Sequence, residues 1–161
     1  MRPTLAALLL ALVAGCGGSP DEAPDASTSA LYSCAKETRA IPYMAGLSRT
    51  SASGHFKAIW QDADPAPPSR GTNTWTVEID DENGAPQDGL TITASPFMPD
   101  HNHPSTVKAV VTPMGNGVYS MTPLYLYMPG YWEVTLSFTP AGSGEAGNTD
   151  DSVVFPVCIP G

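Results

Sequence analysis

A period-two alternation of apolar and polar residues constrains the fold of this chain more than any other feature. It is clearest in residues 74–80, TWTVEID, where Trp75, Val77 and Ile79 alternate with polar residues. Successive side chains of a β-strand point to opposite faces of a sheet, so such a segment buries one face and exposes the other. The segments LTITASP (90–96) and WEVTLSF (132–138) repeat the pattern. These segments predict half-buried antiparallel strands.

Turn residues punctuate the chain at intervals of roughly ten residues. Weaker alternating segments lie near residues 55–62, 105–112, 118–127 and 152–158, which brings the number of expected strands to seven. DENGAPQDG and the tight turn MGNG connect strands, whereas PAPPSRG (65–71) is expected to be a stiff connection and residues 141–151 a mobile loop. We therefore predict an all-β fold, an immunoglobulin-like antiparallel β-sandwich of about seven strands.

The first residues of the chain read as an export signal. Residues 1–15, MRPTLAALLLALVAG, carry one cation at Arg2 before an apolar run, which is too short to span a bilayer as a mature helix. The sequence Val13-Ala14-Gly15-Cys16 resembles the lipobox of bacterial lipoproteins, in which the cysteine is lipidated. We expect residues 1–15 to be a lipoprotein signal peptide and Cys16 the lipidated N-terminus. A plain secretory signal cut elsewhere is the alternative.

The segment after Cys16 contains no large apolar residue, so we expect residues 16–30 to be a flexible tether to a domain at 31–161. In a two-membrane bacterium, Gly17 after the cysteine fits outer-membrane sorting, as in lipoproteins generally. The expected location is the cell envelope, on the outer membrane facing the periplasm or the cell surface, with the acyl chains providing the membrane contact.

The charge balance and the motifs exclude several function classes. Only 7 Lys and Arg residues and a net charge of -9 leave too few cations to neutralise nucleic-acid phosphates or to form a polybasic membrane patch. The sequence also lacks a GxSxG elbow, an HExxH helix and a P-loop. We therefore expect no nucleic-acid partner and no enzymatic activity.

Two cysteines remain in the domain, Cys34 and Cys158, one near each of its ends. An exported compartment is oxidising, so an even pair is most simply a disulfide. A bond that closes so long a loop stabilises the fold by up to about 5 kcal/mol in the chain-entropy model. A redox or copper-binding thiol pair is the alternative, but it lacks the close spacing of CxxC.

One loop concentrates side chains with metal chemistry. The sequence PFMPDHNHPS brings Met98, His101 and His103 within six residues. Imidazole binds copper, zinc and nickel, whereas a thioether favours Cu(I), so the mixed set indicates copper. Because antiparallel strands alternate in direction, Met128 should lie at the same end of the sandwich, with residues 65–71, and is a further candidate ligand.

Other side chains are weaker candidates for the ligand set. Asp100 is a hard oxygen donor, which we expect to orient a histidine or face solvent. Met114 and His55 should lie at the opposite end, and Met121 within a strand, whereas Met44 has no predicted position. Acidic turns at 79–82 and 150–151 leave a Ca²⁺ site as another alternative.

The chain resembles the YtkA-like domain in the order of several short motifs. This domain is an immunoglobulin-like module related to FixH-type proteins and found in bacterial lipoproteins. Over about residues 72–140 the chain has W-x-V-x-I, D-x-x-G-x-P, MP-x-H-x-H, G-x-Y and MPG-x-W in sequence. The resemblance implies an exported β-sandwich without enzymatic activity. It also implies a copper role, and for some relatives metal handling or cytochrome oxidase assembly. The match at the ligand positions covers Met98, His101 and His103, and Met128 more weakly.

This sequence departs from relatives that carry HGHG, because Asn102 and Pro104 stand where those have glycine, which should stiffen the loop or alter access to it. We predict a lipid-anchored domain that binds copper, with Cu(I) favoured, as a metal chaperone or buffer. The alternative is a metal-free structural or interaction module that contacts another envelope protein. In that case Met98 and Met128 cap the core and the histidines belong to a polar loop.

Overall fold

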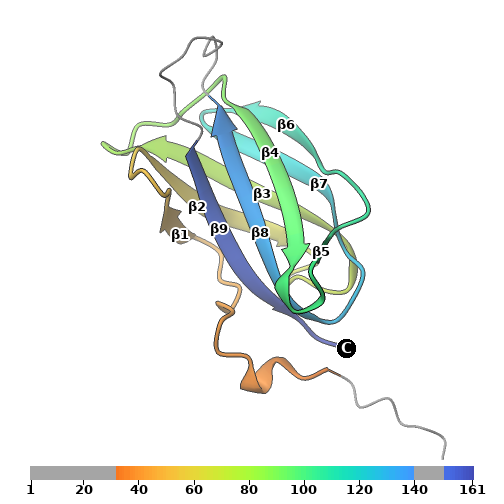
Figure 1. Cartoon of the computed structure of the whole chain (residues 1–161). Coiled ribbons are helices and arrows are strands. Elements are labelled where there is room, and N and C mark those ends of the chain that lie inside the picture. Colours follow the sequence, from red (N-terminus) through yellow and green to blue (C-terminus); the bar gives the residue numbers. More distant parts are fainter. Residues whose placement is uncertain (1–31, 140–150) are drawn as a thin grey trace, which may run out of the picture.

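The computed structural model describes residues 32–139 and 151–161, and these form two antiparallel sheets packed face to face (Figure 1). The larger sheet has the strand order β1 (Leu47–Thr50), β2 (Phe56–Asp64), β3 (Gly71–Asp81), β7 (Val118–Leu126) and β6 (Val110–Gly115). The smaller sheet has the order β5 (His103–Pro104), β4 (Thr91–Met98), β8 (Gly130–Thr139) and β9 (Asp151–Ile159). Two short 3₁₀ helices, η1 (Cys34–Lys36) and η2 (Pro99–His101), complete the described elements.

The predicted fold class is confirmed, and each of the seven expected strands has a counterpart in the two sheets. Two further strands, β1 and β5, were missed because they are only 4 and 2 residues long, too short to show an alternation. The segment expected at 105–112 begins later, as β6 at Val110. The predicted signal peptide, Cys16 and tether lie outside the described residues. So do residues 140–150, whereas Asp151 belongs to β9.

Aromatic side chains from both sheets fill the centre of the sandwich. Trp60 of β2 and Trp75 of β3 are fully buried, with ring centroids 3.9 Å apart. Phe155 of β9 packs edge-on against both rings, at 5.5 Å and 6.2 Å. Aromatic pairs at these separations stabilise a core beyond the area that they bury. The alternating positions seen in the sequence are therefore the ones that join the two sheets.

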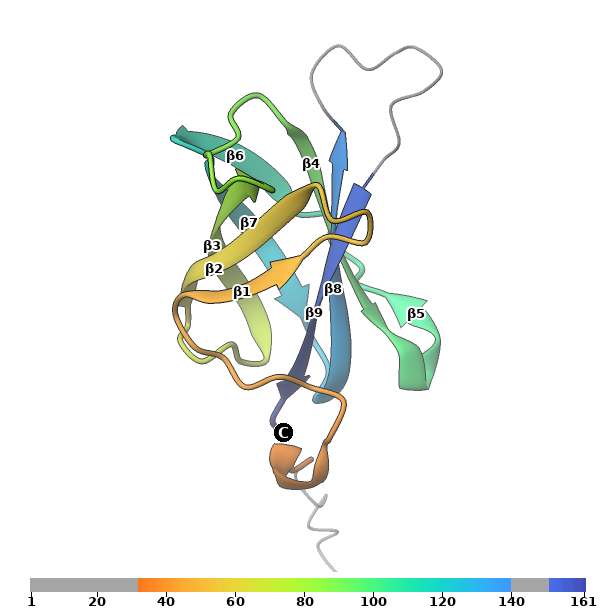
Figure 2. The same ribbon diagram turned by 90° about the vertical axis from the view of Figure 1, so that its left-hand side faces the viewer.

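A disulfide between Cys34 and Cys158 holds the segment before β1 against the smaller sheet, as the sequence predicted. The Ile41 N–H also donates to the Pro156 carbonyl of β9, at 2.9 Å. Figure 2 shows this segment running beside the end of β9, next to the C-terminus. We call residues 32–46 the N-terminal arm. Within the described residues, no helix is long and apolar enough to cross a membrane.

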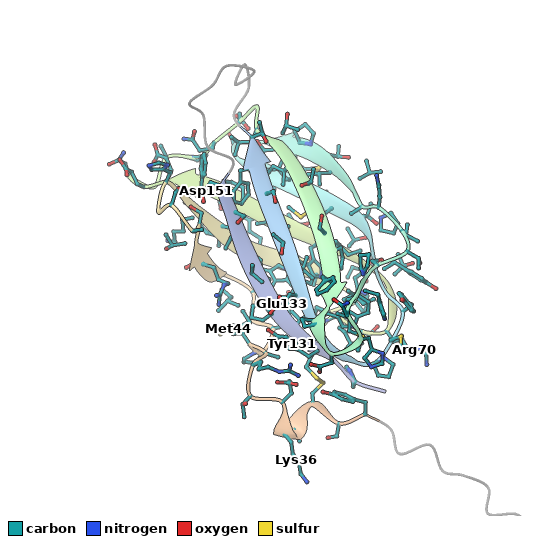
Figure 3. The ribbon with its side chains drawn as sticks, viewed as in Figure 1. Lys36, Met44, Arg70, Tyr131, Glu133 and Asp151 are labelled. Carbon is teal, nitrogen blue, oxygen red and sulfur yellow. A yellow bond between two sulfur atoms is a disulfide. The ribbon has the colours of Figure 1, made fainter. Side chains whose placement is uncertain are left out.

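The loops sort to the two ends of the sandwich as strand direction predicted. Arg70 Nε donates to the Tyr127 carbonyl at 2.9 Å, which places the proline-rich connection beside residues 127–130. At the other end the Gly117 N–H donates to Asp88 Oδ1, so the β6–β7 turn meets the β3–β4 connection. Figure 3 shows Arg70 and Tyr131 towards the end that carries β5, and Asp151 towards the other. We call the end that carries β5 the site end.

A buried carboxylate anchors the chain at the opposite end. Asp151 is 3% exposed and accepts hydrogen bonds from the Ser53 N–H at 3.0 Å, the Ser152 N–H at 2.8 Å and the Ser53 hydroxyl. Burial by itself raises the pKa of Asp151, but hydrogen bonds from Ser51, Ser53 and Ser152 favour the charged form and bring the pKa below its ordinary value.

The Asp151→Asn variant should be less stable than the parent protein at neutral pH, by about 1–3 kcal/mol, because charged hydrogen bonds are lost. A carboxyl whose pKa is lowered by folding stabilises the fold above its unfolded pKa of about 4, and this stability is lost as the pH falls through the lowered pKa. Urea unfolding between pH 7 and pH 2 should therefore show a flatter pH dependence for the variant. Equal pH profiles would contradict this role of Asp151.

Candidate metal site

The candidate ligands lie on a tight hairpin at the site end. β4 ends at Met98, η2 turns the chain, and β5 returns it antiparallel to β4. The turn closes through Asn102, whose φ of 52° is left-handed and whose N–H donates to the Pro99 carbonyl at 3.1 Å. Asparagine tolerates this conformation better than most residues. Asn102 thus supplies a backbone geometry for which glycine is the usual choice.

The register of this hairpin pairs Met98 with His103 directly across the strands. Residues opposite each other in an antiparallel pair project from the same face, with Cβ atoms about 5 Å apart. Met98 is 1% exposed and belongs to the hydrophobic core, whereas His103 is half-buried at its edge. The hairpin therefore places a buried thioether and an imidazole side by side.

His101 completes the group from the last position of η2. Its ring is exposed, and its centroid lies 5.8 Å from that of His103 at an interplanar angle of 82°. Metal–imidazole bonds of about 2.0 Å leave two rings that share an ion at most roughly 6.5 Å apart between centroids. The observed separation fits two imidazoles on one ion.

Met128 reaches the site end from the β7–β8 connection. Its side chain is half-buried and packs against the core, and its carbonyl accepts a hydrogen bond from Trp132 Nε1 at 2.9 Å. The Trp132 ring in turn lies 6.0 Å from His103. Trp132 therefore links the backbone of Met128 to the histidine hairpin. Both methionines also fill the end of the core, as the metal-free interpretation expected.

An aromatic wall beside His103 was not predicted from the sequence. The His103 ring stacks on Tyr127 at 5.5 Å, and Tyr127 stacks on Tyr125 at 5.8 Å. Trp132 packs edge-on against both His103 and Tyr127. The i, i+2 spacing of Tyr125 and Tyr127 near the end of a strand, which sets both rings on one face, could have revealed the wall.

A charged cluster fixes the other side of the hairpin, also without a sequence signal. Arg39 of the N-terminal arm contacts both carboxylate oxygens of Asp100 at 2.7 Å, bonds to Glu37, and lies 4.1 Å from the centre of the Tyr131 ring. Hydrogen bonds from Arg39 hold the pKa of Glu37 at about 2 and lower that of Asp100. Burial, with a hydrogen bond to Glu133, raises the pKa of Tyr131 to about 12. Asp100 thus ties η2 to the arm.

The side chains that were not predicted to be ligands lie away from the histidine hairpin or are buried in the core. Met44 and Met114 are 61% and 66% exposed, on the arm and on β6, and Met121 is buried within β7. His55 directly precedes β2, at the opposite end. These positions agree with leaving them out of the site.

Among residues 32–139 and 151–161, no three His, Cys, Asp or Glu side chains gather closely enough to hold a metal ion. In the acidic turn at residues 79–82, Asp81 Oδ1 accepts hydrogen bonds from the N–H groups of Asn83 and Ala85 and shapes the turn. The candidate site thus has two imidazoles, and any further ligand from the predicted set is a methionine thioether.

Comparison with known proteins found one family and one solved structure that are similar to this chain. The model of a family described as YtkA-like matches residues 62–137. A solved structure, that of a copper-bound variant of FetP from uropathogenic Escherichia coli strain F11, is similar at 15% sequence identity and a TM-score of 0.47. That alignment covers 73% of this chain and 96% of the FetP chain. No curated protein sequence matches the chain.

Gly130→Ala should disturb the site from the Met98 side, since an alanine Cβ would overlap the Met98 Cε methyl. The matched control is Gly71→Ala, where φ is also positive, at 104° against 134°, but nothing lies within 4 Å of the added methyl. Both variants carry backbone strain, and only Gly130→Ala adds overpacking of about 1–3 kcal/mol. In thermal unfolding, Gly130→Ala should have a clearly lower Tm than Gly71→Ala. Equal Tm values would contradict the packing of Met98 against Gly130.

Proposed function

Because this chain carries a YtkA-like domain over residues 62–137, we propose that it is a copper-binding domain anchored by lipid to the cell envelope. It acts as a metal chaperone or buffer and not as a catalyst. The ligands are His101 and His103 with the thioethers of Met98 and Met128.

The observation that carries this proposal is the arrangement of two imidazoles beside a buried thioether. The histidine rings lie 5.8 Å apart, and His103 is the direct cross-strand partner of Met98. Imidazole accepts several divalent metals, but thioether sulfur is soft and selects Cu(I). Hard cations such as Mg²⁺ prefer oxygen ligands, of which the candidate set has none. The donor set therefore fits copper better than other common ions.

The surroundings favour a preorganised site. Pro99 restricts the backbone of η2, and the bidentate Arg39–Asp100 pair holds this turn against the arm. On the other side, Trp132 and Tyr127 shield His103 from water. Ligands that are already in place lose less conformational entropy on binding, so affinity rises without further contacts.

The proposed location rests on the export signal that the sequence predicts. Lipid at Cys16 would hold the domain at the outer membrane, and residues 16–30 would let it reach a partner in the envelope. A chaperone passes its metal to such a partner, and a buffer holds it. Both roles require a site at the surface, which the exposed His101 ring would provide.

A metal-free interaction module is the second candidate. The observation that favours it is an apolar groove of about 480 Å³ beside the disulfide, lined by Pro42, Tyr43, Pro67, Pro68 and Pro160. In this reading the two methionines only fill the end of the core. Copper binding separates the two candidates.

A soluble protein of residues 17–161 should take up about one Cu(I) per chain in a titration against a competing chelator. His101→Ala combined with His103→Ala should abolish this uptake, because both imidazole ligands are lost. His55→Ala is the matched control, since it removes the remaining histidine at the opposite end and should leave uptake unchanged. Failure of the parent protein to take up copper would overturn the copper function.

Met98→Leu tests the thioether separately. This swap conserves volume and should cost less than about 1.5 kcal/mol of stability. It removes the soft ligand, so the affinity for Cu(I) should fall by at least roughly tenfold while Cu(II) binding by the histidines changes little. The chelator competition measures both affinities. Equal losses for the two oxidation states would contradict a thioether that selects Cu(I).

A further inference from the structure

Residues 34–41 of the N-terminal arm are fastened to β9 at both ends. Cys34 forms the disulfide with Cys158, and the Ile41 N–H donates to the Pro156 carbonyl at 2.9 Å. Cys158 and Pro156 both belong to β9. The residues between the two attachments therefore form a closed loop. Closing a loop removes much of its conformational freedom, and opening one end restores it.

Arg39 lies inside this loop and contacts the turn that carries His101. Its guanidinium donates to both carboxylate oxygens of Asp100 at 2.7 Å. Asp100 is the middle residue of η2, and His101 is the last. Glu37, in the same loop, accepts a further hydrogen bond from Arg39 at 2.7 Å. The loop thus reaches the metal site through a bidentate ion pair.

The strength of this ion pair depends on the loop that carries Arg39. The Arg39 side chain is 45% exposed and that of Asp100 is 42% exposed. An exposed ion pair stabilises little when two flexible side chains must first be ordered to form it. Here the backbone of Arg39 is already fixed, so less conformational entropy is lost when the pair forms. Opening the loop should therefore weaken the contact between Arg39 and Asp100.

The disulfide is accessible to a reductant. Cys34 and Cys158 are both half-buried, and both line the apolar groove of about 480 Å³. A dithiol that enters this groove reaches the sulfur atoms. One of its thiolates attacks a disulfide sulfur, and its second thiol resolves the mixed disulfide. Two electrons and two protons pass to the cysteines, which become two thiols, while the dithiol becomes a disulfide.

We propose that the Cys34–Cys158 disulfide is a redox switch for the metal site, with Arg39 as the positioning residue that connects the two. In the oxidised protein Arg39 holds η2 and His101 in place for copper. A dithiol reductant opens the loop, Arg39 leaves Asp100, and copper affinity falls. This inference rests on the proposed copper function. Loss of groups that orient metal ligands costs roughly 10- to 100-fold in affinity, and we expect about tenfold here because Arg39 acts through the turn.

Amide hydrogen exchange, measured by NMR on the protein of residues 17–161, tests the switch without metal. The Ile41 N–H reports on the arm. The Asn102 N–H reports on the turn, because it donates to the Pro99 carbonyl at 3.1 Å. The control for general destabilisation is the Gln87 N–H at the opposite end, which donates to the Ile79 carbonyl at 2.8 Å.

Reduction with dithiothreitol should speed exchange at Ile41 and Asn102 much more than at Gln87, and reoxidation should restore slow exchange. Arg39→Gln should speed exchange at Asn102 while the disulfide is intact. Lys36→Gln is the matched control, because it removes an equal charge from an exposed position of the same arm, and it should leave exchange unchanged. Unchanged exchange at Asn102 after reduction would overturn the proposal, as would an equal rise at Gln87.

A double-mutant cycle measures copper affinity in the chelator competition. Cys34→Ser combined with Cys158→Ser represents the open loop, because the thiolates of a reductant would themselves bind copper. This variant and Arg39→Gln should each lose about tenfold in affinity, and their combination should lose no more. Additive losses, or an unchanged affinity in the cysteine variant, would overturn the proposal. If amide exchange behaves as expected but the parent protein binds no copper, the copper function fails and the coupling between disulfide and turn stands.

Discussion

The pairing of β4 with β5 is the contact on which the candidate site depends. It consists of two residue pairs, Phe97 with Pro104 and Met98 with His103. Because side chains alternate along a strand, a shift of one residue would turn His103 away from Met98 and from the aromatic wall. The hairpin needs the left-handed Asn102 to close in this register. A local backbone geometry thus decides whether two kinds of metal ligand meet.

So short a pairing is held from both sides. The N-terminal arm is fixed to β9 by the Cys34–Cys158 disulfide, and its Arg39 bonds to Asp100 in η2. From the core side, Met98 packs against Gly130, and Trp132 anchors the Met128 carbonyl. An exposed ion pair alone contributes little stability, but a bidentate pair on a tethered segment restricts the turn that presents His101. The disulfide and the charged cluster therefore act on the site as well as on the fold.

Much of the fold was predictable because it follows from local patterns. The alternation of Trp75, Val77 and Ile79 gives a strand with one buried face, and strand direction gives the end at which each loop lies. The disulfide followed from an even pair of cysteines in a chain that the sequence predicts to be exported. The short strands β1 and β5 were not predicted, because their pairing is a tertiary property. The contacts of His103 with Tyr127 and Trp132, and the bond between Arg39 and Asp100, were not predicted for the same reason, since they join residues far apart in the sequence.

In the proposed site, two imidazoles and a thioether share one copper ion. X-ray absorption spectroscopy at the copper edge of the Cu(I)-loaded protein tests this directly, because it separates nitrogen from sulfur ligands. We expect a mixed coordination shell with two imidazole nitrogens and at least one sulfur, and loss of the sulfur contribution when both Met98 and Met128 are replaced by leucine. A first shell of nitrogen and oxygen alone in the parent protein would contradict it.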